Sequence, residues 1–242
     1  MMSPYLAELV GTALLILFGN GVVANVVLTK SKGNGGGWIV ITAGWGMGVM
    51  LAVYAVGKIS GAHLNPAVTI ALAAIGKFDA TLVPGYIIAQ VLGAFLGATL
   101  TWLAYLPHWG ATKDAPTKLG VFCTIPAIRN RLSNLICEII GTAVLVFGAL
   151  AIPSSTNLID NGWATGFGPM LVGLLVFAIG LSLGGPTGYA INPARDLGPR
   201  LAHALLPIAG KGSSDWGYAI VPIVGPIIGG LAGAFLQRTL YV

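Results

Sequence analysis

Two copies of one tripeptide carry the residue types most able to do chemistry in this sequence. They are Asn65-Pro66-Ala67 and Asn192-Pro193-Ala194. Proline suits the first turn of a helix, where its missing N–H is not needed, and the preceding asparagine suits the N-cap. The N-terminus of a helix carries the positive end of its dipole. Each motif is therefore expected to begin a short helix whose positive end, together with an asparagine amide, faces a polar solute and repels cations.

A single Asn-Pro dipeptide would be interpreted most simply as a turn. Here, however, each copy follows a glycine four residues earlier, Gly61 and Gly188. The two copies also occupy matching positions in an internal repeat. This pairing favours a functional site over two unrelated turns.

The composition indicates that lipid surrounds most of this chain. Its 242 residues are 56% hydrophobic and only 8% charged, with a mean hydropathy of +0.87. A soluble domain carries roughly a quarter charged residues. The net charge of +5 comes from scattered basic residues, which gives no indication of a nucleic-acid partner. Cys123 and Cys137 fit neither a disulfide framework nor a metal site, and no metal or cofactor is expected.

Six apolar stretches are long enough to cross a bilayer as helices, which takes about 20 residues. Two further stretches are too short to cross and are expected to be re-entrant. The joints between them are short, apart from 107–132, and we expect them to be polar connections. The six predicted spans are Tyr5–Leu28, Ile39–Gly57, Leu82–Leu106, Ser133–Ile152, Gly162–Pro186 and Trp216–Leu236, and the two short stretches are Leu64–Ile75 and Ile191–Ala209.

The two halves of the sequence repeat one another. Glu8-Leu-Val-Gly-Thr-Ala recurs as Glu138-Ile-Ile-Gly-Thr-Ala, and Gly93 and Gly97 have counterparts in Gly229 and Gly233. Because each unit contains three crossings, an odd number, the second unit must lie inverted relative to the first. The two short segments then enter from opposite faces and meet near the midplane, where irregular backbone requires a wet cavity or burial in protein.

These features resemble the major intrinsic protein family of aquaporins and glycerol facilitators over essentially the whole chain. The segments that carry the resemblance are Ser-Gly-Ala-His-Leu-Asn-Pro-Ala-Val-Thr (60–69) and Asn-Pro-Ala-Arg-Asp (192–196). Asp196 and Val-Pro-Ile-Val-Gly-Pro (221–226) resemble the glycerol-facilitating branch. The resemblance implies an all-α integral membrane protein with six transmembrane helices and two re-entrant half-helices in an inverted repeat. It further implies a homotetramer of single-domain chains (1–242), with repeats over about 1–106 and 133–242.

The resemblance also implies roles for individual residues. Trp45, Gly180, Tyr189 and Arg195 match the selectivity filter, with Gly180 leaving room for a carbon skeleton and Tyr189 replacing the usual phenylalanine. A ladder of backbone carbonyl acceptors is implied for Gly61, Ala62, His63, Leu64, Gly188, Tyr189 and Ala190. Half-helix dipoles are the established reason why aquaporin-type pores exclude protons and cations, and the resemblance implies the same for this chain.

Glu8 and Glu138 are carboxylates within predicted spans, and such residues are often functional. They could be proton-coupling sites, or each could accept hydrogen bonds from the unwound loop of its own half. Their repeat symmetry favours the supporting role, which the resemblance also implies.

We therefore predict a passive channel, not an enzyme, for glycerol and water. Dihydroxyacetone, urea, hydrogen peroxide and undissociated lactic acid are further candidate solutes. The alternatives are a proton-coupled secondary transporter of a small polar solute and a predominantly water-selective aquaporin. The resemblance implies a plasma-membrane protein with both termini in the cytoplasm. The positive-inside rule favours the reverse orientation, since that topology places only Lys58, Lys77 and Arg238 inside and Lys30, Lys32, Lys113, Lys118, Arg129, Arg131 and Lys211 outside.

Overall fold

A computed structural model describes residues 2–154 and 163–241. Over these residues the secondary structure is helical. The elements, in chain order, are α1 (Pro4–Val27), α2 (Trp38–Ser60), α3 (Pro66–Ala74), the 3-10 turn η1 (Ala80–Leu82), α4 (Val83–Ala104), α5 (Leu106–Ala111), α6 (Ala115–Phe122), α7 (Arg131–Ala151), α8 (Trp163–Leu183), α9 (Pro193–Leu205) and α10 (Ile220–Leu240).

The six predicted spans are confirmed as α1, α2, α4, α7, α8 and α10, each of them long and apolar enough to cross a membrane. The predicted boundaries differ from the observed ones by at most four residues. The largest difference is in the last span, which begins at Ile220 because 216–219 form turns with hydrogen bonds such as Ala219 N–H to the Trp216 carbonyl. The predicted joint 153–161 lies almost entirely outside the described residues.

The long joint 107–132 is more ordered than the predicted polar connection. It contains most of α5 and all of α6. Asp114 caps α6 by accepting a hydrogen bond from the Thr117 N–H (2.8 Å), and Pro116 occupies the first turn. The Asp-x-Pro pattern at 114–116 is a helix start signal that was available in the sequence.

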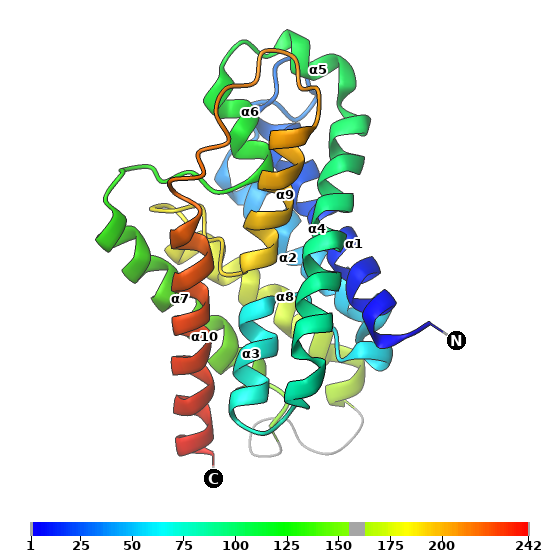
Figure 1. Cartoon of the computed structure of the whole chain (residues 1–242), viewed down its shortest axis with the longest axis vertical. Coiled ribbons are helices and arrows are strands. Elements are labelled where there is room, and N and C mark those ends of the chain that lie inside the picture. Colours follow the sequence, from blue (N-terminus) through cyan, green and yellow to red (C-terminus); the bar gives the residue numbers. More distant parts are fainter. Residues whose placement is uncertain (1, 155–162, 242) are drawn as a thin grey trace.

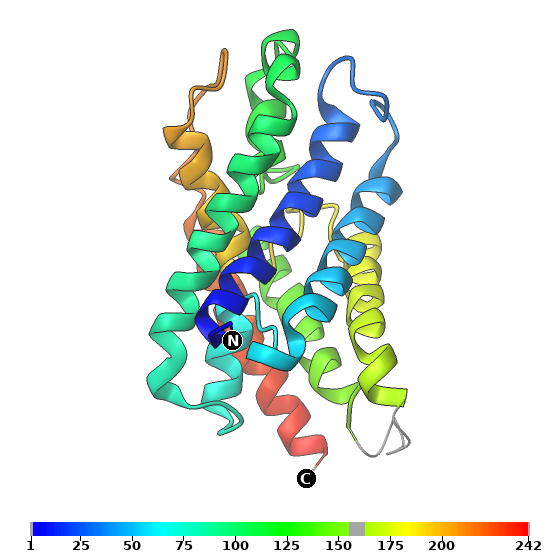
Figure 2. The same cartoon turned by 90° about the vertical axis from the view of Figure 1, so that its right-hand side faces the viewer.

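The half-helices α3 and α9 lie at opposite ends of the bundle and point their N-termini towards its middle (Figure 1). The two termini of the chain lie towards the end away from α5 and α6 in both views (Figures 1 and 2). Each half-helix packs on the last span of the other half, α3 on α10 and α9 on α4. The two halves are therefore interlocked at the level of the motifs.

Glycines allow the spans of each half to touch backbone to backbone. A Cβ added at Gly93 would lie 2.2 Å from the Leu9 carbonyl oxygen, and one at Gly229 would lie 2.2 Å from the Ile139 carbonyl oxygen. Gly97 and Gly233 make the same approach one turn later. Small residues at helix crossings provide the close packing on which membrane proteins depend. The glycines that repeat in the sequence therefore mark the α1–α4 and α7–α10 contacts.

Apolar side chains cover the outside of the bundle. On α4, for example, Leu92, Leu96, Leu100 and Leu103 form a stripe at helical spacing, and each is more than a third exposed. Such a surface is unfavourable in water and suits lipid.

Candidate functional site: two loops around a cavity

The two asparagines cap their half-helices as the sequence predicts. The Asn65 Oδ1 accepts from the Ala67 N–H at 2.9 Å, and the Asn192 Oδ1 accepts from the Ala194 N–H at 3.0 Å and the Arg195 N–H at 3.2 Å. These bonds satisfy helix N-terminal donors and fix the orientation of each amide.

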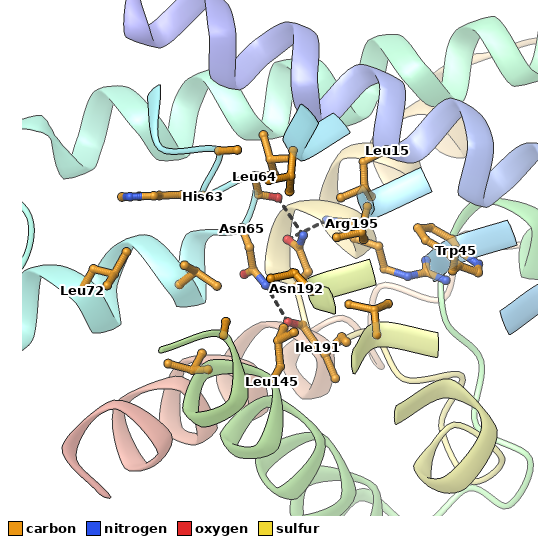
Figure 3. Close-up of a pocket in the computed structure, with 18 of the residues that line it drawn as sticks. Leu15, Trp45, His63, Leu64, Asn65, Leu72, Leu145, Ile191, Asn192 and Arg195 are labelled. Carbon is orange, nitrogen blue, oxygen red and sulfur yellow. Dashed lines mark hydrogen bonds between the residues drawn. The ribbon is translucent and has the colours of Figure 1, made fainter. Parts of the chain in front are cut away.

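The same two side chains also join the loops to each other. Asn65 Nδ2 donates to the Ile191 carbonyl at 2.8 Å, and Asn192 Nδ2 donates to the Leu64 carbonyl at 2.8 Å (Figure 3). Each amide thus uses one hydrogen within the protein. Because an amide nitrogen carries two hydrogens, one on each asparagine is left for a solute in the cavity that both residues line.

Both loops have a backbone that non-glycine residues rarely adopt. In the first loop Ala62 and Leu64 have φ of 48° and 52°, and in the second Tyr189 and Ile191 have φ of 36° and 43°. Left-handed conformations cost of order 1–3 kcal/mol each and persist only when their surroundings hold them. The repeated pattern indicates that strong contacts fix both loops.

Glu8 is the group that holds the first loop. Its Oε1 accepts from the Ser60 hydroxyl (2.6 Å) and the His63 N–H (2.9 Å), and its Oε2 accepts from the Leu64 N–H (2.7 Å) and Gln90 Nε2 (2.8 Å). The side chain is fully buried.

Glu138 holds the second loop in the same way. Its Oε1 accepts from the Thr187 hydroxyl (2.6 Å) and the Ala190 N–H (3.0 Å), and its Oε2 accepts from the Ile191 N–H (2.8 Å). The carboxylates thus accept the loop N–H groups, which turns the loop carbonyls away from them.

A cavity of about 230 Å³ surrounds the paired motifs and is called the motif cavity. Residues of the two loops form part of its wall, among them the predicted ladder residues Gly61, Ala62, His63, Leu64 and Ala190. The His63 ring lies at one end, with Nδ1 3.1 Å from the Thr69 hydroxyl (Figure 3). The rest of the wall is apolar and consists mainly of Leu15, Val49, Val53, Val68, Leu72, Leu145, Val146, Leu150, Val172 and Val176.

A second cavity of about 230 Å³, the α6 cavity, lies beside α6 and includes Gly188 in its wall. The two cavities share three wall residues, Trp45, Tyr189 and Arg195. The Arg195 guanidinium lies over the Trp45 ring, with Cζ 4.2 Å from the ring centroid. Three of the four residues expected in the filter therefore form the boundary between the cavities.

Gly180 packs against the ring of Tyr189. It lines neither cavity; instead, a Cβ at Gly180 would lie 2.8 Å from Tyr189 Cζ and 2.9 Å from the Tyr189 hydroxyl. The role expected of this glycine, leaving room for a carbon skeleton, stays a prediction. Its missing side chain makes room for the Tyr189 ring, which can then lie back against α8.

The Tyr189 hydroxyl also packs against this glycine. The hydroxyl oxygen is buried beside Gly180 and has no hydrogen-bond partner among the described residues. The tyrosine thus presents a ring to the cavities, as a phenylalanine would.

Sequence reasoning missed several residues of this region. Trp38 lines the α6 cavity and donates from Nε1 to the Gly180 carbonyl at 2.9 Å, and the segment Cys123–Ile125 forms another part of that wall. The Ile191 carbonyl is bonded to Asn65 and is the counterpart of Leu64. The inverted repeat pairs position 191 with 64 and could have identified it, whereas Trp38 gave no local signal.

Six spans around two facing half-helices, with a largely apolar cavity bordered by the two loops, two asparagines and an arginine, define a pore-forming multi-pass membrane protein. The family model for the major intrinsic protein matches residues 1–237, and the chain belongs to this family.

Two curated relatives are similar over nearly the whole chain. A probable glycerol uptake facilitator protein of Thermotoga maritima is 63% identical over 99% of this chain and 100% of its own length. A glycerol uptake facilitator protein of Bacillus subtilis is 58% identical over 99% of this chain and 85% of its own length. A solved structure, the aquaglyceroporin from Plasmodium falciparum, has a TM-score of 0.85 at 30% identity and covers 98% of this chain and 95% of that chain. The predicted aquaporin-like fold is thereby confirmed.

Proposed function

We propose that this protein is a passive channel for glycerol and other small uncharged solutes, with water, and that it excludes ions and protons. The observation that carries the proposal is the boundary of Trp45, Tyr189 and Arg195 between two cavities. The names of the relatives from Thermotoga maritima and Bacillus subtilis support glycerol as the solute.

The boundary suits a polyol because it offers two unlike surfaces. Arg195 provides guanidinium donors in a fixed plane, and its contact with Trp45 keeps that plane in place. The Trp45 and Tyr189 rings provide an apolar wall for the CH face of glycerol. A molecule with hydroxyls on one side and C–H on the other can satisfy both surfaces as it passes.

Beyond this boundary a solute exchanges hydration for protein hydrogen bonds. The carbonyls of Gly61, Ala62 and His63 act as acceptors in one loop, and those of Gly188, Tyr189 and Ala190 act in the other. The free amide hydrogens of the asparagines are donors at the midpoint. The Leu64 carbonyl already accepts from Asn192, so it contributes less to the ladder than the other members.

Ion exclusion follows from charge. Arg195 carries a permanent positive charge at the boundary, and α3 and α9 point their positive ends at the midpoint. A cation entering the cavity meets repulsion at both places, and the described residues of the cavity wall include no carboxylate to replace its water.

The hydrogen bonds of Glu8 and Glu138 support a channel over a proton-coupled transporter. Each carboxylate is buried and accepts three or four hydrogen bonds from its own half of the chain. A proton arriving at either oxygen pair would displace bonds that hold the loop. These residues are therefore loop supports.

The chain forms one channel domain over 1–242, with repeats over about 1–106 and 133–242, and assembles as a homotetramer in the plasma membrane. Both termini are cytoplasmic, which places the α6 cavity outside. The basic residues at that end have structural uses: Lys211 Nζ donates to three carbonyls at the C-terminus of α9, and Lys118 Nζ donates to the Ala209 carbonyl. These uses account for part of the positive charge that opposes the positive-inside rule.

The test is stopped-flow light scattering on proteoliposomes with glycerol, urea and a sucrose gradient for water. We expect glycerol flux well above that of empty liposomes, nearly linear in the gradient and unaffected by a proton gradient. High water permeability with glycerol flux equal to that of empty liposomes would instead identify a water-selective aquaporin. Saturable flux driven by a proton gradient would identify a transporter.

A further inference from the structure

Asp196 and Arg200 form a fully buried ion pair in the first turns of α9. Arg200 Nε is 2.7 Å from Asp196 Oδ1, Arg200 Nη2 is 3.0 Å from Asp196 Oδ2, and both side chains have no exposed surface. Neither residue lines either cavity. Because burying two charges is costly unless they are well paired and hydrogen-bonded, the further partners of this pair indicate its use.

All of the guanidinium donors of Arg200 are occupied. Beyond Asp196, Nη1 donates to the Ser214 carbonyl (2.7 Å) and the Asp215 carbonyl (3.0 Å), and Nη2 donates to the Thr124 carbonyl (3.2 Å). Arg200 thus connects α9 to the segment before α10 and to the segment after α6. These three parts of the chain lie together at one end of the bundle (Figure 1).

Thr124 forms hydrogen bonds to the ion pair through its N–H, its hydroxyl and its carbonyl. Its N–H donates to Asp196 Oδ2 at 2.9 Å, its hydroxyl donates to the same oxygen at 2.7 Å, and its carbonyl accepts from Arg200. This side chain is buried. The ion pair therefore fixes both the position and the direction of the backbone at residue 124.

The fixed backbone is part of the pore wall. Cys123, Thr124 and Ile125 line the α6 cavity, and the Phe122 carbonyl lies 3.5 Å from Arg195 Nη1. Arg195 therefore has its guanidinium between the Trp45 ring on one side and the Phe122 carbonyl on another. A shift of the 122–125 segment would remove one of these two contacts.

We propose that Asp196 and Arg200 are positioning residues that hold the 122–125 segment against Arg195 and so set the preference of the pore for a polyol over water. A polyol needs several fixed partners at once, whereas a water molecule passes with one. Loss of the fixed wall therefore affects the polyol more. The inference rests on the proposed function for its solute, but the structural part of it does not.

The first half of the chain supports this assignment by its contrast. The residues at the same distances from Asn65 are Thr69 and Ala73, which carry no charge. The ion pair thus occurs only in the half that also provides Arg195, where a wall segment from outside the repeat has to be placed.

The first experiment compares Asp196→Asn and Arg200→Lys with the parent protein in proteoliposomes. We expect the ratio of glycerol to water permeability to fall at least about fivefold in Asp196→Asn, since small misplacements of binding groups are costly, and to fall less in Arg200→Lys, which keeps a positive charge beside Asp196. Arg129→Gln is the matched control, because Arg129 pairs with Asp215 at the same end of the molecule and is 52% exposed. It is expected to keep the parent ratio.

The second experiment reports the position of the segment without any solute. Cys123 is 1% exposed, and burial raises the pKa of its thiol. In a Cys137→Ser background it is the remaining cysteine of the chain. A membrane-impermeant maleimide is expected to label Cys123 slowly in this background and with Arg129→Gln, and at least about tenfold faster with Asp196→Asn, since an exposed thiol is the reactive one.

A fall in the permeability ratio together with faster labelling would support the proposal. If Asp196→Asn retains water permeability but shows an unchanged ratio, the pair does not set selectivity, whatever the labelling shows, and the proposal is overturned. If Asp196→Asn does not fold, Thr124→Val decides by the same two measurements, because it removes only the hydroxyl donor. Absence of glycerol flux in the parent would refute the proposed function alone, since the labelling arm needs no glycerol.

Discussion

The two motif loops of this protein, 60–65 and 187–192, have nearly the same backbone and different surroundings. Each has a left-handed glycine and two left-handed residues after it, a carboxylate that accepts its N–H groups, and an asparagine that bonds to the other loop. This common part holds the midpoint of the pore. It is the same in both halves because the backbone has the same unmet donors in both.

The loops differ in the residues around their supporting carboxylates and half-helices. In the first half Gln90 donates to Glu8 and to the Thr69 hydroxyl, which makes a neutral network. When the two halves are aligned on Gly93 and Gly229, Gln90 corresponds to Pro226. In the same way Thr69, four residues after Asn65, corresponds to Asp196, four residues after Asn192. Asp196 is paired with the charged Arg200 instead of a neutral amide.

A third difference is at the position three residues after each asparagine, which is Val68 in the first half and Arg195 in the second. Both line the motif cavity. The repeat therefore provides a symmetric support, and the proposed discrimination among solutes depends on residues that break its symmetry. The predictions below test that division, from the largest expected effect to the smallest.

The largest effect is expected from Glu138→Gln. The NH₂ group of the new amide would face loop N–H groups that now donate hydrogen bonds to Glu138. A buried donor would then be unpaired, which should lower the free energy of unfolding by about 3 kcal/mol. Glu8→Gln should cost less, about 1–2 kcal/mol, because the Gln90 amide can turn and offer its unpaired Oε1 to the new amide. Thermal unfolding of the detergent-solubilised variants measures both.

The variant Glu8→Gln with Gln90→Leu provides the control for that difference. It removes the proposed rescue and should be as unstable as Glu138→Gln. Equal stability of the two single variants would show that the neutral layer around Gln90 does not matter.

The second effect concerns charge at the boundary. Arg195→Val gives the second half the residue that the first half already has, and it removes the permanent charge from between the cavities. We expect measurable cation leakage in voltage-clamped or dye-loaded vesicles, with water flux retained. Val68→Ala is the control at the equivalent position. Ion leakage no greater than in the parent would place ion exclusion with the half-helices alone.

The third effect is on pore width. Gly180→Ala places a Cβ 2.8 Å from Tyr189 Cζ, so the ring has to move away from α8. Because the other side of this ring faces the cavities, we expect glycerol permeability to fall several-fold, on the order of 1 kcal/mol in barrier height, with a smaller loss for water. Gly185→Ala, where an added Cβ meets no atom within 4 Å, is the control. Parallel stopped-flow measurements with glycerol and water decide the matter.

The smallest effect is expected from Tyr189→Phe. The hydroxyl is buried and has no hydrogen-bond partner in the described part of the chain. Its removal should therefore leave permeability within about twofold of the parent and stability unchanged or raised by about 1 kcal/mol. A large loss of glycerol flux would mean that the hydroxyl contacts the solute.

Much of the fold could be predicted because a bilayer imposes few and strict rules. Spans of about 20 apolar residues are readable from composition, and the Glu8 and Glu138 repeats indicate the inverted second half. The predicted start of α10 was less accurate because the turns at 216–219 contain no charged residue or proline that would separate them from the helix. The two helices within 107–132 were missed although Asp114 signalled one of them.

For the site, too, some features could be predicted from the sequence and others only from the tertiary structure. The sequence by itself determined the asparagine caps and the placement of Arg195 three residues after Asn192, because each depends on short spacing along the chain. It also indicated the supporting carboxylates, because Glu8 and Glu138 recur at matching positions of the internal repeat. Only the tertiary structure decided that Gly180 makes room for the Tyr189 ring, that the Tyr189 hydroxyl is buried, and that Asp196 and Arg200 contact the wall segment beside Arg195. These contacts join α8 to the second loop and α9 to the joint after α6, and spacing along a chain carries no information about which distant segments pack together.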